Sequence, residues 1–135
     1  MKISQVAQLT GLSSKSIRFY ESKGLIIPPD RESNGYRDYS WQQIEQLRLI
    51  ASARQVGFSL EECAALLQLA QNKQRTSAEI KYQTQQKVAE IENKIMQLQQ
   101  IKTLLESWID QCPGNDNADC PILEKLYHYQ SGDTT

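Results

Sequence analysis

The segment from Ser77 to Gln111 contains neither glycine nor proline, and its apolar residues recur at alternating steps of four and three. This heptad spacing predicts a helix of about 33 residues, roughly 50 Å long at 1.5 Å per residue. Folded back on its own N-terminal domain, such a helix would outrun it, because the chain has only 135 residues. We therefore expect a second copy to cover the apolar face in a two-fold dimer. The face consists of Thr84, Val88, Ile91, Ile95, Leu98, Lys102 and Leu105, widened by Ile101, Leu104 and Trp108.

The N-terminal residues have the pattern of two short helices. Ser4 is placed to cap the first helix, and Gly11 to take a positive φ in the turn that follows. Ser13 or Ser14 caps the second helix, which stops at Gly24. Two short helices joined by such a turn form a helix-turn-helix pattern, although an ordinary helical hairpin fits these residues equally well.

The next segment, LIIPPDRESNGYRDYS, holds two prolines and an Asn-Gly pair, so it is not helical. Leu25–Ile27 and Tyr36–Tyr39 fit two short strands with Asn34-Gly35 near their tip. A β-wing after two short helices favours a winged helix-turn-helix over a simple hairpin. Two linking helices follow, the first capped by Ser40 and the second by Ser59.

Charge and composition bound the function. The net charge is −1, but residues 1–75 hold ten Lys or Arg against seven Asp or Glu, whereas residues 76–135 hold five against nine. A basic front half suits contact with a polyanion. We see neither a signal peptide nor a membrane span, which predicts a cytoplasmic protein in which a structural disulfide is disfavoured. No catalytic triad, pair of catalytic carboxylates or phosphate-binding glycine loop is visible, so we expect no enzyme.

The order of these elements resembles the MerR family of transcription regulators. The residues that carry the resemblance are ISQVAQLTGLSSKSIRFYESKGLI, NGYRDYS and ARQVGFSLEE, and it covers essentially the whole chain. Within the family, CPGNDNADCPI is most similar to the metal loop of the copper-efflux regulators. The resemblance implies a mainly α fold with a winged helix-turn-helix and linking helices at 1–75. It further implies a dimerisation helix in an antiparallel coiled coil at 76–111, and a metal-binding loop, short helix and tail at 112–135.

The second helix and the wing supply candidate DNA contacts. A recognition helix needs polar and basic side chains over an apolar underside, and here Ile17 and Phe19 are expected to form that underside. Arginine pairs with phosphate or guanine, and a tyrosine hydroxyl donates to phosphate. The candidate contacts are Lys15, Ser16, Arg18, Tyr20, Arg31, Tyr36, Arg37, Tyr39 and Arg54.

The resemblance also implies a mechanism. Regulators of this family occupy double-stranded promoters whose spacer is too long for RNA polymerase to engage both elements. The metal-free dimer holds such a promoter unproductively, and the metal-bound dimer kinks and undertwists it. Energy differences of a few kcal/mol suffice to shift occupancy between the two DNA forms.

The cysteine loop predicts a site for a soft monovalent ion. A structural zinc site takes four nitrogen or sulfur ligands, whereas the loop offers two thiols, Cys112 and Cys120. Thiolates suit Cu(I), and a d¹⁰ monovalent ion accepts linear two-coordination, as do Ag(I) and Au(I). Pro113, Gly114 and Pro121 stiffen the loop.

Two thiolates around one M⁺ leave a net charge of −1, which is costly to bury without compensation. Ser77 lies at the positive N-terminal end of the long helix, and Lys81 lies one turn further on the same face. In a dimer, these residues of the second copy are expected to reach the loop. By resemblance, divalent sensors of the family carry a third cysteine at the position of Ser77, so serine favours ions of charge +1.

Alternatives to a copper site remain open. A Cys112–Cys120 disulfide would make the chain a thiol redox sensor that binds DNA. A thiol oxidoreductase is disfavoured, since the pair is not CXXC and no βαβ pattern surrounds it. Cys63 lies in an apolar run and is expected in the core, and His128 is expected at the surface.

Overall fold

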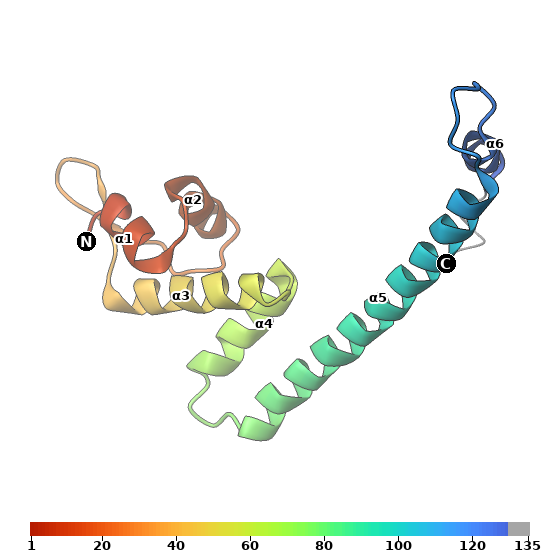
Figure 1. Cartoon of the computed structure of the whole chain (residues 1–135). Helices are drawn as coiled ribbons and strands as arrows, with labels where there is room; N and C mark the ends of the chain where they lie inside the picture. Colours follow the sequence, from red (N-terminus) through yellow and green to blue (C-terminus); the bar gives the residue numbers. More distant parts are fainter. Residues whose placement is uncertain (130–135) are drawn as a thin grey trace. The chain divides into compact units, whose positions relative to one another are not determined.

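The computed structural model describes residues 1–129. It contains two short strands and six helices within that range. Figure 1 labels the helices. In chain order they are α1 (Ile3–Thr10), α2 (Ser14–Ser22), β1 (Asp30–Arg31), β2 (Arg37–Asp38), α3 (Trp41–Gln55), α4 (Leu60–Gln71), α5 (Ser77–Gln111) and α6 (Pro121–His128). The predicted mainly α fold class is confirmed. The chain forms two compact units, Met1–Lys87 and a second that begins at Val88. The predicted tail after Tyr129 lies outside the described residues.

Serine caps begin three of the N-terminal helices as predicted. The Ser13 hydroxyl accepts a 3.0 Å hydrogen bond from the Ser16 N–H, and Ser40 and Ser59 cap α3 and α4. The cap of α1 was predicted wrongly. Its N-cap is Lys2, whose N–H donates to the Gln5 side chain at 3.1 Å, so the helix starts one residue before Ser4.

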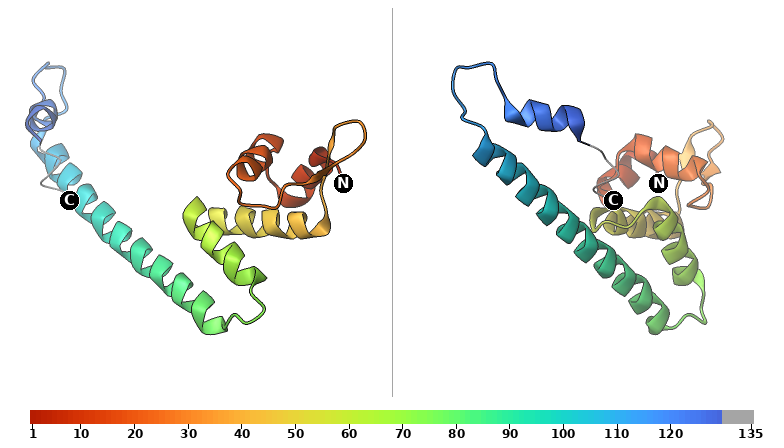
Figure 2. Two further views of the ribbon diagram at one scale, coloured as in Figure 1. Left: turned by 180° about the vertical axis from the view of Figure 1, so that it is seen from behind. Right: turned by 90° about the vertical axis from the view of Figure 1, so that its right-hand side faces the viewer.

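The core of the first unit lies among α1, α2, α3 and α4, which pack around one another in both views of Figure 2. α3 supplies its central stripe, with Ile44, Leu47 and Ile50 at or below 1 % exposure. Cys63 on α4 is fully buried beside them, which confirms its predicted place in the core. This core fixes α2 and the wing on one scaffold.

The wing is shorter than predicted and begins later. Its two strands pair antiparallel, with Asp30 opposite Asp38 and Arg31 opposite Arg37. The predicted strand at Leu25–Ile27 is wrong. The Ile27 N–H donates to the buried side chain of Gln46 at 3.3 Å, and the Ile27 carbonyl accepts from Gln43 at 3.0 Å. Side chains of α3 therefore satisfy the backbone that a strand would have used.

The long helix α5 has 35 residues, which corresponds to about 52 Å. It begins with a reciprocal cap, because the Thr76 hydroxyl accepts from the Glu79 N–H at 3.3 Å and the Glu79 carboxylate accepts from the Thr76 N–H at 3.4 Å. Its predicted apolar face is exposed in the single chain. The exposed members are Val88 (49 %), Ile91 (40 %), Ile95 (57 %), Leu98 (64 %), Ile101 (44 %) and Leu105 (46 %).

That exposed face is what the predicted dimer would cover, and the dimer itself stays a prediction. Within residues 1–129, no helix combines the length and the apolar character that crossing a bilayer would require. In the second unit, Trp108 near the end of α5 is 6 % exposed. Its ring meets Tyr129 edge-to-face, with centroids 5.8 Å apart, which ties the end of α6 to α5.

Candidate DNA interface and metal-binding loop

The outward face of α2 presents Lys15, Arg18 and Phe19. Lys15 and Arg18 are exposed, as predicted for side chains that meet DNA. Phe19 is 43 % exposed with the Lys23 ammonium 5.6 Å from its ring centroid, whereas Tyr20 is 8 % exposed and belongs to the core. The prediction that Tyr20 is exposed and Phe19 buried is therefore wrong: Phe19 is the exposed residue and Tyr20 the buried one. The helical period places Tyr20 above Ile17, three residues earlier, on the inward face.

Tyr39 is also a core residue, contrary to its predicted role as a clamp on the DNA backbone. It is 3 % exposed, and its hydroxyl donates to Glu21 Oε2 at 3.1 Å. Burial and the Glu21 charge raise the pKa of Tyr39 to about 12. The same carboxylate accepts from Arg37 Nε at 3.0 Å, so Glu21 of α2 holds two residues at the end of the wing. Sequence reasoning missed Glu21; its acidic side chain within a basic helix was the available signal.

The remaining DNA candidates lie in the wing, in α3 and in the first turn of α2. Tyr36 is 65 % exposed at the wing, and Arg31 donates from Nη1 to the Gly35 carbonyl at 2.9 Å. Arg54, in the last turn of α3, is exposed and donates from Nη1 to the Phe58 carbonyl at 3.2 Å. Ser16 lies in the first turn of α2, where its hydroxyl accepts from the Ser13 hydroxyl at 2.9 Å. Each arginine keeps further N–H donors for phosphate.

The two loop cysteines lie together. Both are half-buried and neither is in a disulfide. Cys120 is the N-cap of α6, with Pro121 at the first helical position. The neighbouring Leu123 and Ile122 N–H groups and the Cys112 thiol lower the pKa of Cys120 below its ordinary value, although the Cys120 side chain makes no capping hydrogen bond. The start of α6 therefore stabilises a thiolate, the form that binds metal.

The loop between the two cysteines is a series of tight turns. Gly114 has a φ of 60°, which favours glycine. Asn115 accepts from the Asn117 N–H at 2.9 Å, and Asn117 accepts from the Asp119 N–H at 3.4 Å. These side-chain turns return the chain from the end of α5 to the start of α6 and so bring Cys112 near Cys120.

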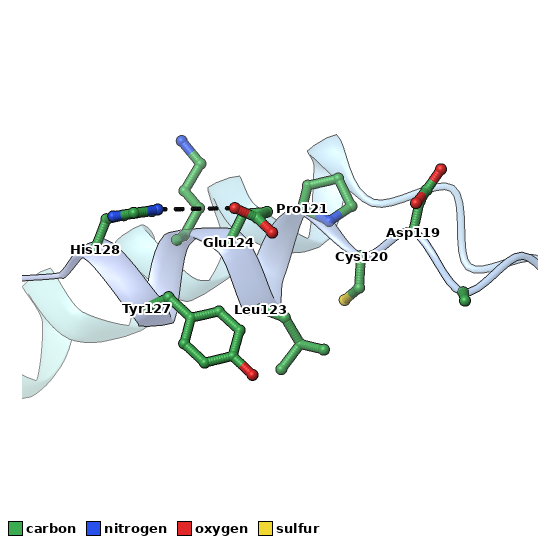
Figure 3. Close-up of a pocket in the computed structure, with 9 residues that line it drawn as sticks. Asp119, Cys120, Pro121, Leu123, Glu124, Tyr127 and His128 are labelled. Atoms are coloured by element: carbon green, nitrogen blue, oxygen red, sulfur yellow. Dashed lines mark ion pairs between the residues drawn. The ribbon is translucent and has the colours of Figure 1, made fainter.

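The Cys120 sulfur projects from the same side of α6 as Leu123 and Tyr127, as Figure 3 shows. An open hollow of about 690 Å³ runs along this helix. His128 lies on the other side, where its Nε2 is 3.8 Å from Glu124 Oε2. Its side chain is 81 % exposed, which confirms the predicted surface position. His128 is thus not brought to the sulfurs.

The donors near the loop are few. Within residues 1–129, no group of three or more His, Cys, Asp or Glu side chains is arranged to hold a metal ion. The thiol pair fits an ion that takes two soft ligands and does not fit a four-ligand zinc site. Ser77 and Lys81 are both exposed in the first turns of α5, in the first compact unit. Their predicted approach to the loop of a second copy stays a prediction.

Comparison with known proteins places this architecture in a family. The family described as "MerR HTH family regulatory protein" matches residues 1–70, and the family described as "MerR, DNA binding" matches residues 44–108. The chain belongs to the MerR family. MerR-family proteins are DNA-binding transcription regulators.

Relatives within the MerR family cover nearly the whole chain. The HTH-type transcriptional regulator CueR of Vibrio cholerae is 54 % identical over 93 % of this chain and 91 % of its own length. CueR of Escherichia coli O157:H7 is 51 % identical over 98 % of this chain and 100 % of its own. HmrR of Rhizobium leguminosarum is 45 % identical over 93 % and 97 %, respectively.

Solved MerR-family structures share the fold. The regulator PbrR691 of Ralstonia metallidurans, in complex with lead(II), has a TM-score of 0.81 at 25 % identity and covers 93 % of this chain and 98 % of its own. MerR of Bacillus megaterium, in complex with a mercury(II) ion, has a TM-score of 0.73 at 30 % identity and covers 94 % and 99 %. Both of these relatives were solved with a soft heavy-metal ion bound.

Proposed function

We propose that this MerR-family member is a cytoplasmic homodimer that activates transcription in response to Cu(I), with Ag(I) and Au(I) as equivalent ligands. Cys112 and Cys120 would be its two metal ligands. The genes controlled would serve copper efflux or detoxification, since the relatives at 51–54 % identity carry the name CueR, that of the copper-efflux regulator.

One observation carries the proposal: the loop brings Cys112 close enough to Cys120, at the start of α6, for the Cys112 thiol to contribute to the lowered pKa of Cys120. Two sulfurs at the two ends of one short loop can both bind one small ion. Together they supply two soft donors, and His128 faces away on the other side of α6. Two donors complete the shell of a monovalent d¹⁰ ion and leave a divalent ion under-coordinated. Cu(I) would form one bond to each sulfur and displace the thiol protons.

The residues around the ion account for charge. The N–H groups of Leu123 and Ile122 lower the pKa of Cys120 and so favour its negative form. In the proposed dimer, the first turn of α5 from the second copy adds its positive helix end and Lys81, while Ser77 adds no third thiolate. With two thiolates in place of three, the site would carry one negative charge less and would therefore select +1 over +2 ions.

The DNA interface of the proposal comprises Lys15, Ser16 and Arg18 of α2, Tyr36, Arg31 and Arg37 of the wing, and Arg54 of α3. Tyr20 and Tyr39 are left out because both are buried. The metal-free dimer would hold promoter DNA, and the metal-bound dimer would bend and untwist it for RNA polymerase. Metal binding needs to favour the bent form by only a few kcal/mol to switch occupancy.

Two cysteine variants test the metal site. Cys112→Ser and Cys120→Ser are each expected to abolish Cu(I)-dependent transcription in vitro while DNA affinity stays within about twofold of the unmodified chain. Cys63→Ala is the matched control, because Cys63 is buried in the core of the first unit and is not a residue of the loop. X-ray absorption on the copper-loaded protein should report two sulfur neighbours. Three or four donors, or a normal copper response in either serine variant, would refute the site.

The close thiols also support a second candidate, a redox sensor that uses a Cys112–Cys120 disulfide. Mass spectrometry of oxidant-treated protein distinguishes the two. A loss of two protons that links Cys112 to Cys120, accompanied by a change in transcription without any metal, would favour the redox sensor. Unchanged transcription under oxidant would leave the metal sensor as the function of the loop.

A further inference from the structure

Lys87 is buried in the long helix, where the apolar spacing predicts no charged core position. Among the residues of α5, all of which the structure describes, Lys87 and Trp108 alone are buried. Lys87 is 5 % exposed, and lysine is rarely buried unless it is paired. Its position belongs to the first compact unit, which ends at this residue.

The Lys87 ammonium contacts the beginning of α4. Its Nζ lies 2.8 Å from Glu62 Oε1 and 5.5 Å from the centroid of the Phe58 ring. Glu62 is itself fixed, because its Oε1 accepts the Ser59 N–H at 2.7 Å and its own N–H donates to the Ser59 hydroxyl at 3.1 Å. Lys87 thus grips a carboxylate that is already part of the helix cap.

That cap adjoins a candidate DNA contact. Phe58 is 8 % exposed in the core, its N–H donates to the Ala53 carbonyl at 2.9 Å, and its carbonyl accepts from Arg54 Nη1 at 3.2 Å. The contacts run without a gap from Lys87 through Phe58 to Arg54. One of the five N–H donors of the Arg54 guanidinium is thereby used for orientation, which leaves others for a phosphate.

We propose that Lys87 is a positioning residue that links the long helix to DNA binding: through Glu62 and Phe58 it holds the turn that orients the Arg54 guanidinium toward phosphate. A small displacement of α5 would then reach the DNA interface through packed side chains, without passing through α2 or the wing. The inference rests on the proposed function for the role of Arg54, and it adds the route by which α5 acts on the interface.

The test measures the salt dependence of DNA affinity, which counts phosphate contacts. The full-length protein would bind, without metal, a fluorescent duplex that the unmodified chain selected from a random pool, over a series of salt concentrations. The variants are Lys87→Met, Lys87→Arg, Arg54→Ala and the double variant K87M/R54A. Lys94→Met is the matched control, because Lys94 lies on the same helix in an exposed pair with Glu90 at 3.1 Å.

Lys87→Met and Arg54→Ala should lower the salt slope by the same amount, and the double variant should lower it no further. Lys87→Arg should retain most of the salt slope of the unmodified chain, and Lys94→Met should leave that slope unchanged. A merely structural role for Lys87 would add its effect to that of Arg54→Ala. Three results would each overturn the inference: a double variant whose loss of slope is the sum of the two single losses, a Lys87→Met slope equal to that of the unmodified chain, or an Arg54→Ala slope equal to that of the unmodified chain.

Glu62→Gln keeps the test decisive if Lys87→Met does not fold, because glutamine preserves the helix cap and removes the charge that Lys87 meets. It should lower the slope as Arg54→Ala does, and an unmodified slope would overturn the inference. Because these measurements use no metal, their failure is separate from that of copper sensing. The copper response of the unmodified chain, measured by in vitro transcription, tests the latter.

Discussion

The Tyr39 hydroxyl donates a 3.1 Å hydrogen bond to Oε2 of Glu21, across the junction between the wing and α2. Arg37 Nε meets the same carboxylate at 3.0 Å. The recognition helix and the wing are therefore joined by one acidic side chain that is 15 % exposed. Since both elements are candidates for DNA contact, this carboxylate sets the spacing between them.

Replacing Glu21 by alanine should weaken both folding and DNA binding. The buried Tyr39 hydroxyl would lose its partner, and an unsatisfied buried polar group costs about 1–3 kcal/mol. Chemical denaturation should show a loss of that size, and fluorescence anisotropy should show weaker DNA binding. Tyr39→Phe should cost less, because it removes the donor and keeps the Glu21–Arg37 pair. Glu45→Ala, at an exposed position of α3, is the control; equal effects at Glu21 and Glu45 would contradict the role of the junction.

The sequence predicted those elements whose signals are local. Ser13, Ser40 and Ser59 begin helices because each hydroxyl can accept a nearby backbone N–H, a property of four consecutive residues. The heptad of α5 also needs only its own spacing. Tyr20 and Tyr39 were misassigned because an aromatic ring with a hydroxyl suits both a core and a phosphate contact. Only the packing of α2 and the wing against α3 decides between the two.

The start of the wing was predicted wrongly for a related reason. Leu25–Ile27 has the composition of a strand, but its neighbour in space is α3, 16 to 19 residues later in the chain. No local pattern reveals that glutamine side chains satisfy its backbone. The cysteine pair could be predicted as a ligand set from residue types alone, whereas its support by the N–H groups of Ile122 and Leu123 required the start of α6 to be located.

Gln43→Ala tests the anchor of that segment. The Gln43 amide donates to the carbonyls of Ile27 at 3.0 Å and Pro28 at 3.1 Å, while its oxygen accepts the Ser40 N–H at 2.7 Å. Removal leaves several backbone groups without these partners, so we expect a loss of about 2–3 kcal/mol by urea denaturation. Gln42→Ala, the exposed neighbour, should change stability by less than about 0.5 kcal/mol. A neutral Gln43→Ala would show that water replaces the side chain at no cost.

Acid should weaken the contact between Glu62 and Lys87. The hydrogen bond from Lys87, with help from the Ser59 cap, lowers the pKa of Glu62 to about 2. Between pH about 4.5 and 2 the unfolded chain binds more protons than the folded one, so this contribution is present above that window and is lost as the pH falls through it. The Glu62 side chain is 34 % exposed, so water screens the pair and we expect only about 1 kcal/mol.

Glu62→Gln isolates that contribution. The free energy of unfolding should be lower for Glu62→Gln than for the unmodified chain at pH 7, and the difference should shrink as the pH falls toward 2, where Glu62 begins to take up its proton in the folded state as well. Glu61→Gln is the control, since Glu61 is exposed in the same turn of α4. A gap between Glu62→Gln and the unmodified chain that stays constant from pH 7 to pH 2 would contradict the ion pair.

Ile95→Glu should abolish the proposed dimer. Ile95 is 57 % exposed at the centre of the apolar face of α5, and a charge there would be buried in each of two apposed helices. Sedimentation at tens of micromolar should give a monomer. Met96→Glu is the matched control, because Met96 is 62 % exposed one position off that face and should stay dimeric. A dimeric Ile95→Glu would move the interface away from α5.

Ser77→Cys should broaden the metal response. In the proposed dimer, a cysteine at the first turn of α5 would add a third thiolate to the pair from the loop of the second copy. Three thiolates suit divalent ions, which prefer more than two ligands, and their extra charge offsets the +2 ion. In vitro transcription should then respond to Zn²⁺ or Hg²⁺ in addition to Cu(I). Ser77→Ala adds no ligand and should keep the original profile; if Ser77→Cys kept it too, Ser77 would play no part in charge selection.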